Sequence, residues 1–482
     1  MPQNDDTFRR PWLAEAYYQF SKALPMGLAG TLRSTTGILE LQALGHMGSK
    51  PLAGRSLSLL IVNLTGYPFM YGLGGALETL CSQGFTATVP GTKKIGVYVQ
   101  HAIWLFLLAN VFLAILWLNP TTFLSMLNAD AEVLHYAKVY LAFECLYFPC
   151  IIVQTCLKRF LLAQGLMQPT VGFEMAGLVG MWAGLRLFGD SGWNLGFIGV
   201  PLASTIAYFA VLLANALYIY MTPCRSEWGA FTISDFRPNA RLITALGVPC
   251  AISGIASYGF SDLATLAVTS LGAHGLAIQA VLNSIKGAFA RTGSYLSMVI
   301  SSRTGNLLGD RNPQGAKLSA NVSVLMTLLS ATLIALPMLI SPKLIASFIT
   351  KDPELILSLV PLMPLLALVT VLDVVSNVLT GVLRGQSRQA VAAAVRVVAL
   401  YVVAVPLAWL LCFAVGWGLA GLWVGMALGF VLIAGTEAWL VFTSDWVAET
   451  ERCMERIGAA KWPLSPLLAE AAPIDESTPL LQ

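Results

Sequence analysis

The chain has 482 residues, of which 56% are hydrophobic and 11% are charged, and its formal net charge is +3. A soluble domain usually carries about a quarter charged residues, so most of this chain must be solvated by lipid. Because apolar segments long enough to span a bilayer recur along the chain, a soluble domain on one anchor is excluded. The few scattered basic residues form no nucleic-acid-binding surface.

Apolar runs between polar segments predict twelve membrane-spanning helices. They lie near residues 15–44, 53–82, 96–119, 134–160, 168–189, 195–221, 240–270, 276–301, 318–342, 355–383, 390–414 and 418–444. The predicted fold is therefore all-α and integral to the membrane.

The two halves of the chain echo one another at an offset of about 222 residues, a weak internal symmetry of the kind that transporters show. For example, Gly196-Phe-Ile-Gly199 returns as Gly418-Leu-Ala-Gly421. Because each repeat contains an even number of spans, two pseudo-symmetric six-helix bundles should be related by an axis along the membrane normal. The predicted parts are an N-terminal tail (1–19), an N-lobe (20–221), a linker (222–240), a C-lobe (241–444) and a C-terminal tail (445–482).

Basic residues set the expected orientation, because Lys and Arg accumulate in cytoplasmic loops. If both termini are cytoplasmic, Lys158, Arg159 and Arg384 fall in loops on that side, whereas Lys50 and Arg55 fall in the opposite loops.

Nothing in the sequence indicates an enzyme. The eight cysteines show no CxxC spacing, and no nucleotide-binding loop, metal-ligand cluster or catalytic triad is visible. We therefore expect no metal and no cofactor other than a coupling ion, which would be a proton or sodium.

Ionisable residues at membrane depth are costly, so each one raises a functional hypothesis. Glu40 lies in the wet first span, and pairing with Arg33 is the structural alternative to a coupling role. Asp262 follows Tyr258 and several small residues that leave room for a ligand. Asp373 lies one turn before Asn377, and Arg396 is the expected counter-charge of these two aspartates. Glu437 is expected to be interfacial, and the roles of three further residues stay open: Glu144, Glu174 and Arg186.

Several motifs, in order, resemble the multidrug and toxic compound extrusion (MATE) family in its eukaryotic branch. They include Gly45-His-Met-Gly48, the run from Gly75 to Gln83, Arg303-Thr-Gly-Asn306 and Gly381-Val-Leu-Arg384-Gly385. The resemblance covers roughly residues 20 to 445. It implies a twelve-helix fold with a V-shaped cleft between the lobes, and extrusion coupled to inward flow of protons or sodium.

The resemblance also implies roles for particular residues. The family's acidic sites in the first and tenth helices fall on Glu40 and Asp373, which leaves Asp262 as a third ion-coupling candidate. Eukaryotic members normally carry two acidic residues in the seventh helix, and here the earlier position is Ser257. Glu78 belongs to a family motif and is either structural or part of the cavity, together with Tyr258, Asn377 and Arg396.

The expected function is secondary-active export of small organic compounds, cationic or amphipathic, in exchange for protons. The alternative is a flippase for a lipid-linked intermediate within the same superfamily shape. Glu476, Leu480 and Leu481 resemble a dileucine sorting signal for clathrin adaptors, unless the tail is simply frayed. We expect a monomer in contact with membrane lipids, in a vacuolar, endosomal or plasma membrane of a eukaryote.

Overall fold

The computed structural model describes residues 11–87, 94–119, 130–189, 192–350 and 352–457, and these residues form helices and connecting turns without any strand. This confirms the all-α prediction. A helix satisfies its backbone hydrogen bonds within one segment, which is what a chain surrounded by lipid requires. The sorting residues Glu476, Leu480 and Leu481 lie outside the described residues.

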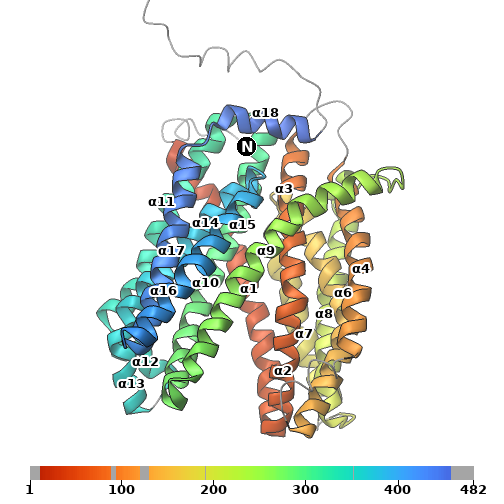
Figure 1. Cartoon of the computed structure of the whole chain (residues 1–482). Coiled ribbons are helices and arrows are strands. Elements are labelled where there is room, and N and C mark those ends of the chain that lie inside the picture. The colour runs from red at the N-terminus through yellow and green to blue at the C-terminus, as the bar shows by residue number, and fades with distance from the viewer. Residues whose placement is uncertain (1–10, 88–93, 120–129, 190–191, 351, 458–482) are drawn as a thin grey trace, which may run out of the picture.

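The N-terminal half consists of one long helix, one bent pair and four further long helices (Figure 1). They are α1 (Pro11–Met47), α2 (Ser49–Thr65), α3 (Tyr67–Thr86), α4 (Ile95–Leu118), α6 (Ala131–Ala163), α7 (Pro169–Phe188) and α8 (Gly199–Met221), the last preceded by the short turn η3 (Gly196–Ile198). The connection to the second half contains η4 (Pro223–Glu227).

The C-terminal half begins with two long helices and ends with a helix that lies across the bundle. Its elements are α9 (Phe236–Thr269), α10 (Gly272–Gly309), α11 (Pro313–Ile340), α12 (Pro342–Ile349), α13 (Pro353–Leu359), η5 (Val360–Leu362), α14 (Met363–Gly385), α15 (Gln389–Val397), η6 (Val398–Ala404), α16 (Val405–Trp409), η7 (Leu410–Ala414), α17 (Gly418–Phe442) and α18 (Trp446–Arg456). Pro406 lacks an N–H, and the helix widens to π-type turns on both sides of it.

Nine helical segments of the described chain are long and apolar enough to cross a membrane, or ten if α2 and α3, bent by 41°, form one span. α1 and α10, with 37 and 38 residues, are also long enough but more polar. These numbers are consistent with the predicted twelve spans. The helices run further than predicted: α10 continues to Gly309, whereas the apolar run suggested an end near residue 301.

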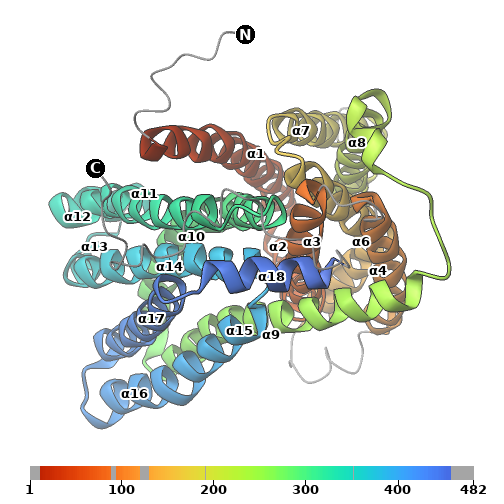
Figure 2. The same ribbon diagram turned by 90° about the horizontal axis from the view of Figure 1, so that it is seen from above.

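The two halves lie side by side, each with its own hydrophobic core (Figures 1 and 2). α1 and α9 cross between them in opposite directions. α1 begins beside α10 and α11 and then packs on α7, whereas α9 begins beside α4, where Asn239 contacts His101, and ends in the second half.

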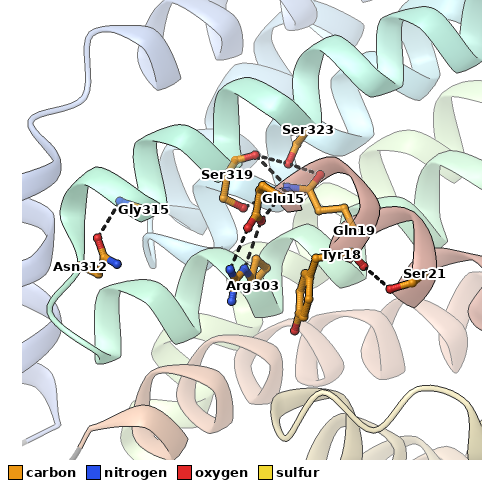
Figure 3. Close-up of polar contacts among 9 residues, drawn as sticks. All are labelled: Glu15, Tyr18, Gln19, Ser21, Arg303, Asn312, Gly315, Ser319 and Ser323. Carbon is orange, nitrogen blue, oxygen red and sulfur yellow. Dashed lines mark hydrogen bonds and ion pairs between the residues drawn. The ribbon is translucent and has the colours of Figure 1, made fainter. Parts of the chain in front are cut away.

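Hydrogen bonds between the described parts of the two halves gather at the end of the bundle where α18 lies and where α3, α6, α10 and α14 end. We call it the α18 end, and its predicted side is the cytoplasm. There Arg303 donates to both carboxylate oxygens of Glu15, at 3.1 and 2.7 Å. Gln19 donates to the carbonyl of Ser319 and accepts from Ser323, each at 3.0 Å (Figure 3).

A second set of bonds at the α18 end repeats itself across the two halves. Thr79 and Gln83 of α3 donate to the carbonyls of Arg384 and Gly385, both at 2.8 Å. Ser302 and Asn306 of α10 donate to the carbonyls of Leu162 and Ala163, both at 3.1 Å. Corresponding members stand about 222 positions apart, so the internal repeat seen in the sequence reappears as a symmetric pair of contacts.

Candidate functional site: a polar cavity in the second half

A cavity of about 240 Å³ opens among α9, α10, α14, α15 and α17. α9 and α10 contribute mostly small and hydroxyl residues, so the wall facing α14 leaves room for a solute. Tyr71 of α3 also lines it and lies edge-on to Tyr258, with ring centroids 6.1 Å apart, so both halves contribute to the wall. The charged lining residues are Lys286, Asp373, Arg384 and Arg396.

Asp373 is the carboxylate of this cavity and is only 7% exposed. Asn377, one turn later on α14, donates to its Oδ1 at 2.9 Å and to its backbone carbonyl at 2.8 Å. In the described chain no basic side chain lies within ion-pair distance of it. The one-turn spacing of these two residues brings them into contact, and both line the cavity.

Arg396 lines the cavity but does not pair with an aspartate, contrary to the expected counter-charge role. Its guanidinium donates to Ser257 at 2.9 Å and to Thr380 at 3.0 Å. Asp262, the proposed partner, is exposed and is not among the lining residues. The preceding residue, Ser261, does line the cavity.

Glu437 contradicts its predicted interfacial position, because its side chain is completely buried. It lies on α17, and both of its carboxylate oxygens face the hydroxyl of Thr380, at 3.0 and 2.9 Å. The apolar run alone placed it near a helix end, since hydropathy does not show which face of α17 packs against α14. Thr380 separates Glu437 from the cavity.

Glu78 does not line the cavity but joins the two halves. It is 1% exposed and pairs with Arg159 of α6 at 2.6 Å and with Arg384 of α14 at 3.1 Å. Both arginines had been assigned to cytoplasmic loops, where a basic residue at the end of a span is usually placed. Both arginines lie near the ends of their helices, where α6 and α14 pack against α3, and they are therefore inside the bundle.

Glu40 belongs to a second buried cluster, in the first half. Arg55 of α2 contacts Glu40 at 2.9 Å and Glu144 of α6 at 2.8 Å, and lies over the ring of Tyr140 at 4.8 Å. The distribution of basic residues predicts Arg55 in an outer loop, and the role of Glu144 was left open, so the sequence did not reveal this cluster. A basic residue at the start of a span carries no local signal of burial.

Arg33 does not pair with Glu40, the structural alternative considered above. It lies 4.0 Å from Glu174, which also pairs with Lys158. Glu174 therefore has basic partners on two other helices, whereas Arg186 is exposed on α7, over the ring of Trp182. No group of three or more metal-ligating side chains occurs in the described parts of the chain.

Comparison with known proteins shows the family to which this chain belongs. A family model described as MatE matches residues 25–181 and 249–410, which together form most of the chain. The chain belongs to the MatE family. This MATE protein is 28% identical over 92% of its length to Protein DETOXIFICATION 51 of Arabidopsis thaliana, covering 84% of it. It is also 28% identical to an uncharacterized transporter, C4B3.13, of Schizosaccharomyces pombe, over 92% of this chain and 82% of that one.

Solved structures agree on the fold of this MATE protein. The eukaryotic MATE transporter AtDTX14 superposes with a TM-score of 0.83 at 22% identity, covering 92% of this chain and 99% of the other. The MATE transporter VcmN of Vibrio cholerae, in its bent form, superposes with a TM-score of 0.78 at 19% identity, covering 92% and 99%. The chain is therefore a multi-pass membrane transporter of the extrusion family, and not an enzyme.

Proposed function

We propose that this MATE protein is a secondary-active antiporter that exports small organic compounds, cationic or amphipathic, in exchange for protons, and that it binds them in the cavity of the second half. The observation that carries the proposal is Asp373, a carboxylate in the cavity wall held by an amide instead of a cation. Such a group can attract a cation or accept a proton, but one excludes the other. Tyr71 and Tyr258 offer ring faces to a flat cation.

The charges around the cavity support exchange in this direction. Arg384 is already paired with Glu78. The remaining charged residues of the wall are Lys286, Asp373 and Arg396. Glu437 lies directly behind the wall, in contact with Thr380. When Asp373 and Glu437 are both ionised, their negative charges balance the positive charges of Lys286 and Arg396. Each proton taken up then leaves one additional positive charge at the cavity, which repels a cationic solute and favours its release.

A flippase remains the second candidate, since three cations line the cavity. It is weaker because Arg384 has an acid partner and Glu437 lies close behind Arg396. An anionic lipid head group would therefore find only Lys286 without a nearby acid, and Lys286 itself lies over the ring of Phe430, 5.2 Å from its centre.

The test is transport by the purified chain in sealed vesicles loaded with a fluorescent organic cation. We expect export when protons can flow inward, and none after a proton ionophore collapses the gradient. A sodium gradient at equal pH on both sides distinguishes the other coupling ion, and an anionic dye of similar size tests the cationic preference. Export that continues unchanged without either gradient would contradict antiport.

The subcellular location is a further part of the proposal. We propose that Glu476, Leu480 and Leu481 direct a monomeric transporter to a vacuolar, endosomal or plasma membrane through clathrin adaptors. In a tagged chain, Leu480→Ala with Leu481→Ala should change the location and leave transport per molecule unchanged. An unchanged location would show that the tail carries no sorting signal.

A further inference from the structure

Glu437 differs from the other buried glutamates of the described chain, each of which has a basic partner. Glu15 pairs with Arg303, and Glu449 pairs with Arg452. Glu40 and Glu144 share Arg55, Glu78 has two arginines, and Glu174 has Lys158 within reach. Glu437 is 0% exposed, yet its contact is a neutral hydroxyl, and no described basic group lies within 4.0 Å of it. An ionised carboxylate held in this way is costly unless it can take up a proton.

The hydroxyl that faces Glu437 has an unusual orientation for a threonine in a helix. Helical threonines commonly bond a carbonyl one turn earlier, as Thr370 of the same helix does to Leu366 at 2.7 Å. Thr380 instead points at Glu437 from α14 and accepts a hydrogen bond from Arg396. Because Thr380 also lines the cavity, it connects the cavity to Glu437.

A count of hydrogens indicates that Glu437 is under-satisfied when ionised. Thr380 has one hydroxyl hydrogen, and the carboxylate has two oxygens at 2.9 and 3.0 Å from it. A proton on one carboxylate oxygen would supply the missing hydrogen and could be donated to the Thr380 oxygen. The neighbouring helices contribute Arg396 of α15 and Arg384 of α14 as the charged groups nearest Glu437, and across the cavity lie Asp373 and Lys286.

We propose that Glu437 is a proton-binding site of the transport cycle, joined through Thr380 to Arg396 in the cavity wall. The inference rests on the proton antiport proposed above and adds a second carboxylate to Asp373. In one half-cycle a proton from cavity water bonds to a carboxylate oxygen of Glu437, and in the other half-cycle the same O–H bond breaks and the proton returns to water. Loss of the negative charge leaves Arg396 unbalanced and makes the cavity less favourable for a cation.

The first test detects the proton directly in the purified chain. Infrared difference spectra between high and low pH should contain the C=O stretch of a protonated carboxyl group. We expect one component to disappear in Glu437→Gln and to remain in Asp373→Asn. A spectrum that is identical in wild type and Glu437→Gln overturns the proposal. Because this readout needs no transport, it separates a failure of the Glu437 site from a failure of proton antiport.

The second test keeps Glu437 in place, in case its replacement prevents folding. Thr380→Val removes the hydroxyl at nearly constant volume, and Thr370→Val is the matched control on the same helix. We expect Thr380→Val to shift the carboxyl band and the pH midpoint of transport and to lower gradient-driven export about tenfold, whereas Thr370→Val keeps the wild-type band and midpoint. Equal behaviour of the two variants means that Thr380 does not connect Glu437 to the cavity and overturns the proposal.

Discussion

The buried carboxylates in this chain differ in whether a basic side chain neutralises them, and this difference separates structural from functional candidates. Arg55 is enclosed by Glu40 and Glu144 from two other helices. A buried pair of this kind contributes little net stability, but removal of one partner leaves an uncompensated charge. The cluster therefore joins α1, α2 and α6, and the coupling role of Glu40 stays a prediction.

Arg55→Met should strongly destabilise the protein, because two glutamates then face each other without a cation. Breaking a buried ion pair costs about 3–5 kcal/mol. Thermal unfolding in detergent measures the loss, and Arg241→Met provides the control, since Arg241 is exposed on α9. If the two variants unfold at the same temperature, the Arg55 cluster has no structural role.

Asp373→Asn should lower proton-driven export about tenfold or more while the protein stays folded, because an amide matches the carboxylate in size but cannot change its charge. Transport assays in vesicles over a range of pH measure this loss of export. Asp262→Asn is the informative comparison. If Asp262→Asn alone abolishes export and Asp373→Asn is active, coupling resides on the exposed side of α9 and the cavity assignment is wrong.

At the scale of elements, the contact of α3 with α10 depends on small residues. A Cβ atom added at Gly305 would lie 2.0 Å from the Ser82 hydroxyl, and one at Gly309 would lie 2.3 Å from the Gln83 carbonyl. The two helices can approach closely only because these side chains are absent, as in other small-residue helix contacts in membranes. The same approach brings the donors Ser302 and Asn306 within reach of α6.

Gly305→Ala should therefore separate α3 from α10 and destabilise the fold, although alanine normally favours a helix by about 1 kcal/mol over glycine. Gly172→Ala on α7 is the matched control, because nothing lies within 4 Å of a Cβ there. We expect a lower unfolding temperature for Gly305→Ala and an equal or slightly higher one for Gly172→Ala. The opposite order would show that the α3 contact can relax without cost.

Much of the element level could be predicted, because lipid forces apolar runs to form helices. The polar contacts could not. Glu78 and Arg384 are 306 positions apart, so their pairing depends on how the halves meet. The position of Glu437 and the partners of Arg396 were predicted wrongly for a related reason: hydropathy locates a residue along a helix but does not show which neighbour its face contacts. Asp373 and Asn377 were placed correctly because one turn of a single helix fixes their contact.

At the scale of the whole molecule, many of the ties between the halves lie at the α18 end. Beside the cavity, the halves also meet through the ring contact of Tyr71 with Tyr258 and the ion pair of Glu78 with Arg384. Alternating access requires such ties to break and re-form, since the central site must open to each side in turn. With the predicted orientation, the described arrangement is closed toward the cytoplasm. The bidentate contact of Arg303 with Glu15 is one of its strongest ties.

Arg303→Ala should favour opening at the α18 end, because α1 then loses this tie to α10. Spin labels at two exposed residues, Arg225 in η4 directly after α8 and Glu451 on α18, report the distance between these two elements. We expect a broader and longer distance distribution in Arg303→Ala. The control is Arg237→Ala, which lies near the start of α9. Identical distributions in all three proteins would mean that the Glu15 contact does not hold the halves together.

The symmetric bonds at the α18 end have a genetic consequence, because their acceptors are backbone carbonyls in the last turns of α6 and α14. Every amino acid carries the same carbonyl, so a missense change cannot delete it. A scan of all single substitutions can select variants whose α18 end no longer closes. Substitutions that remove one of these hydrogen bonds should then be found at the donors Thr79, Gln83, Ser302 and Asn306. Substitutions at Leu162 and Ala163 can affect closure only through packing. The acceptor side of these hydrogen bonds therefore cannot be removed by a change of side chain.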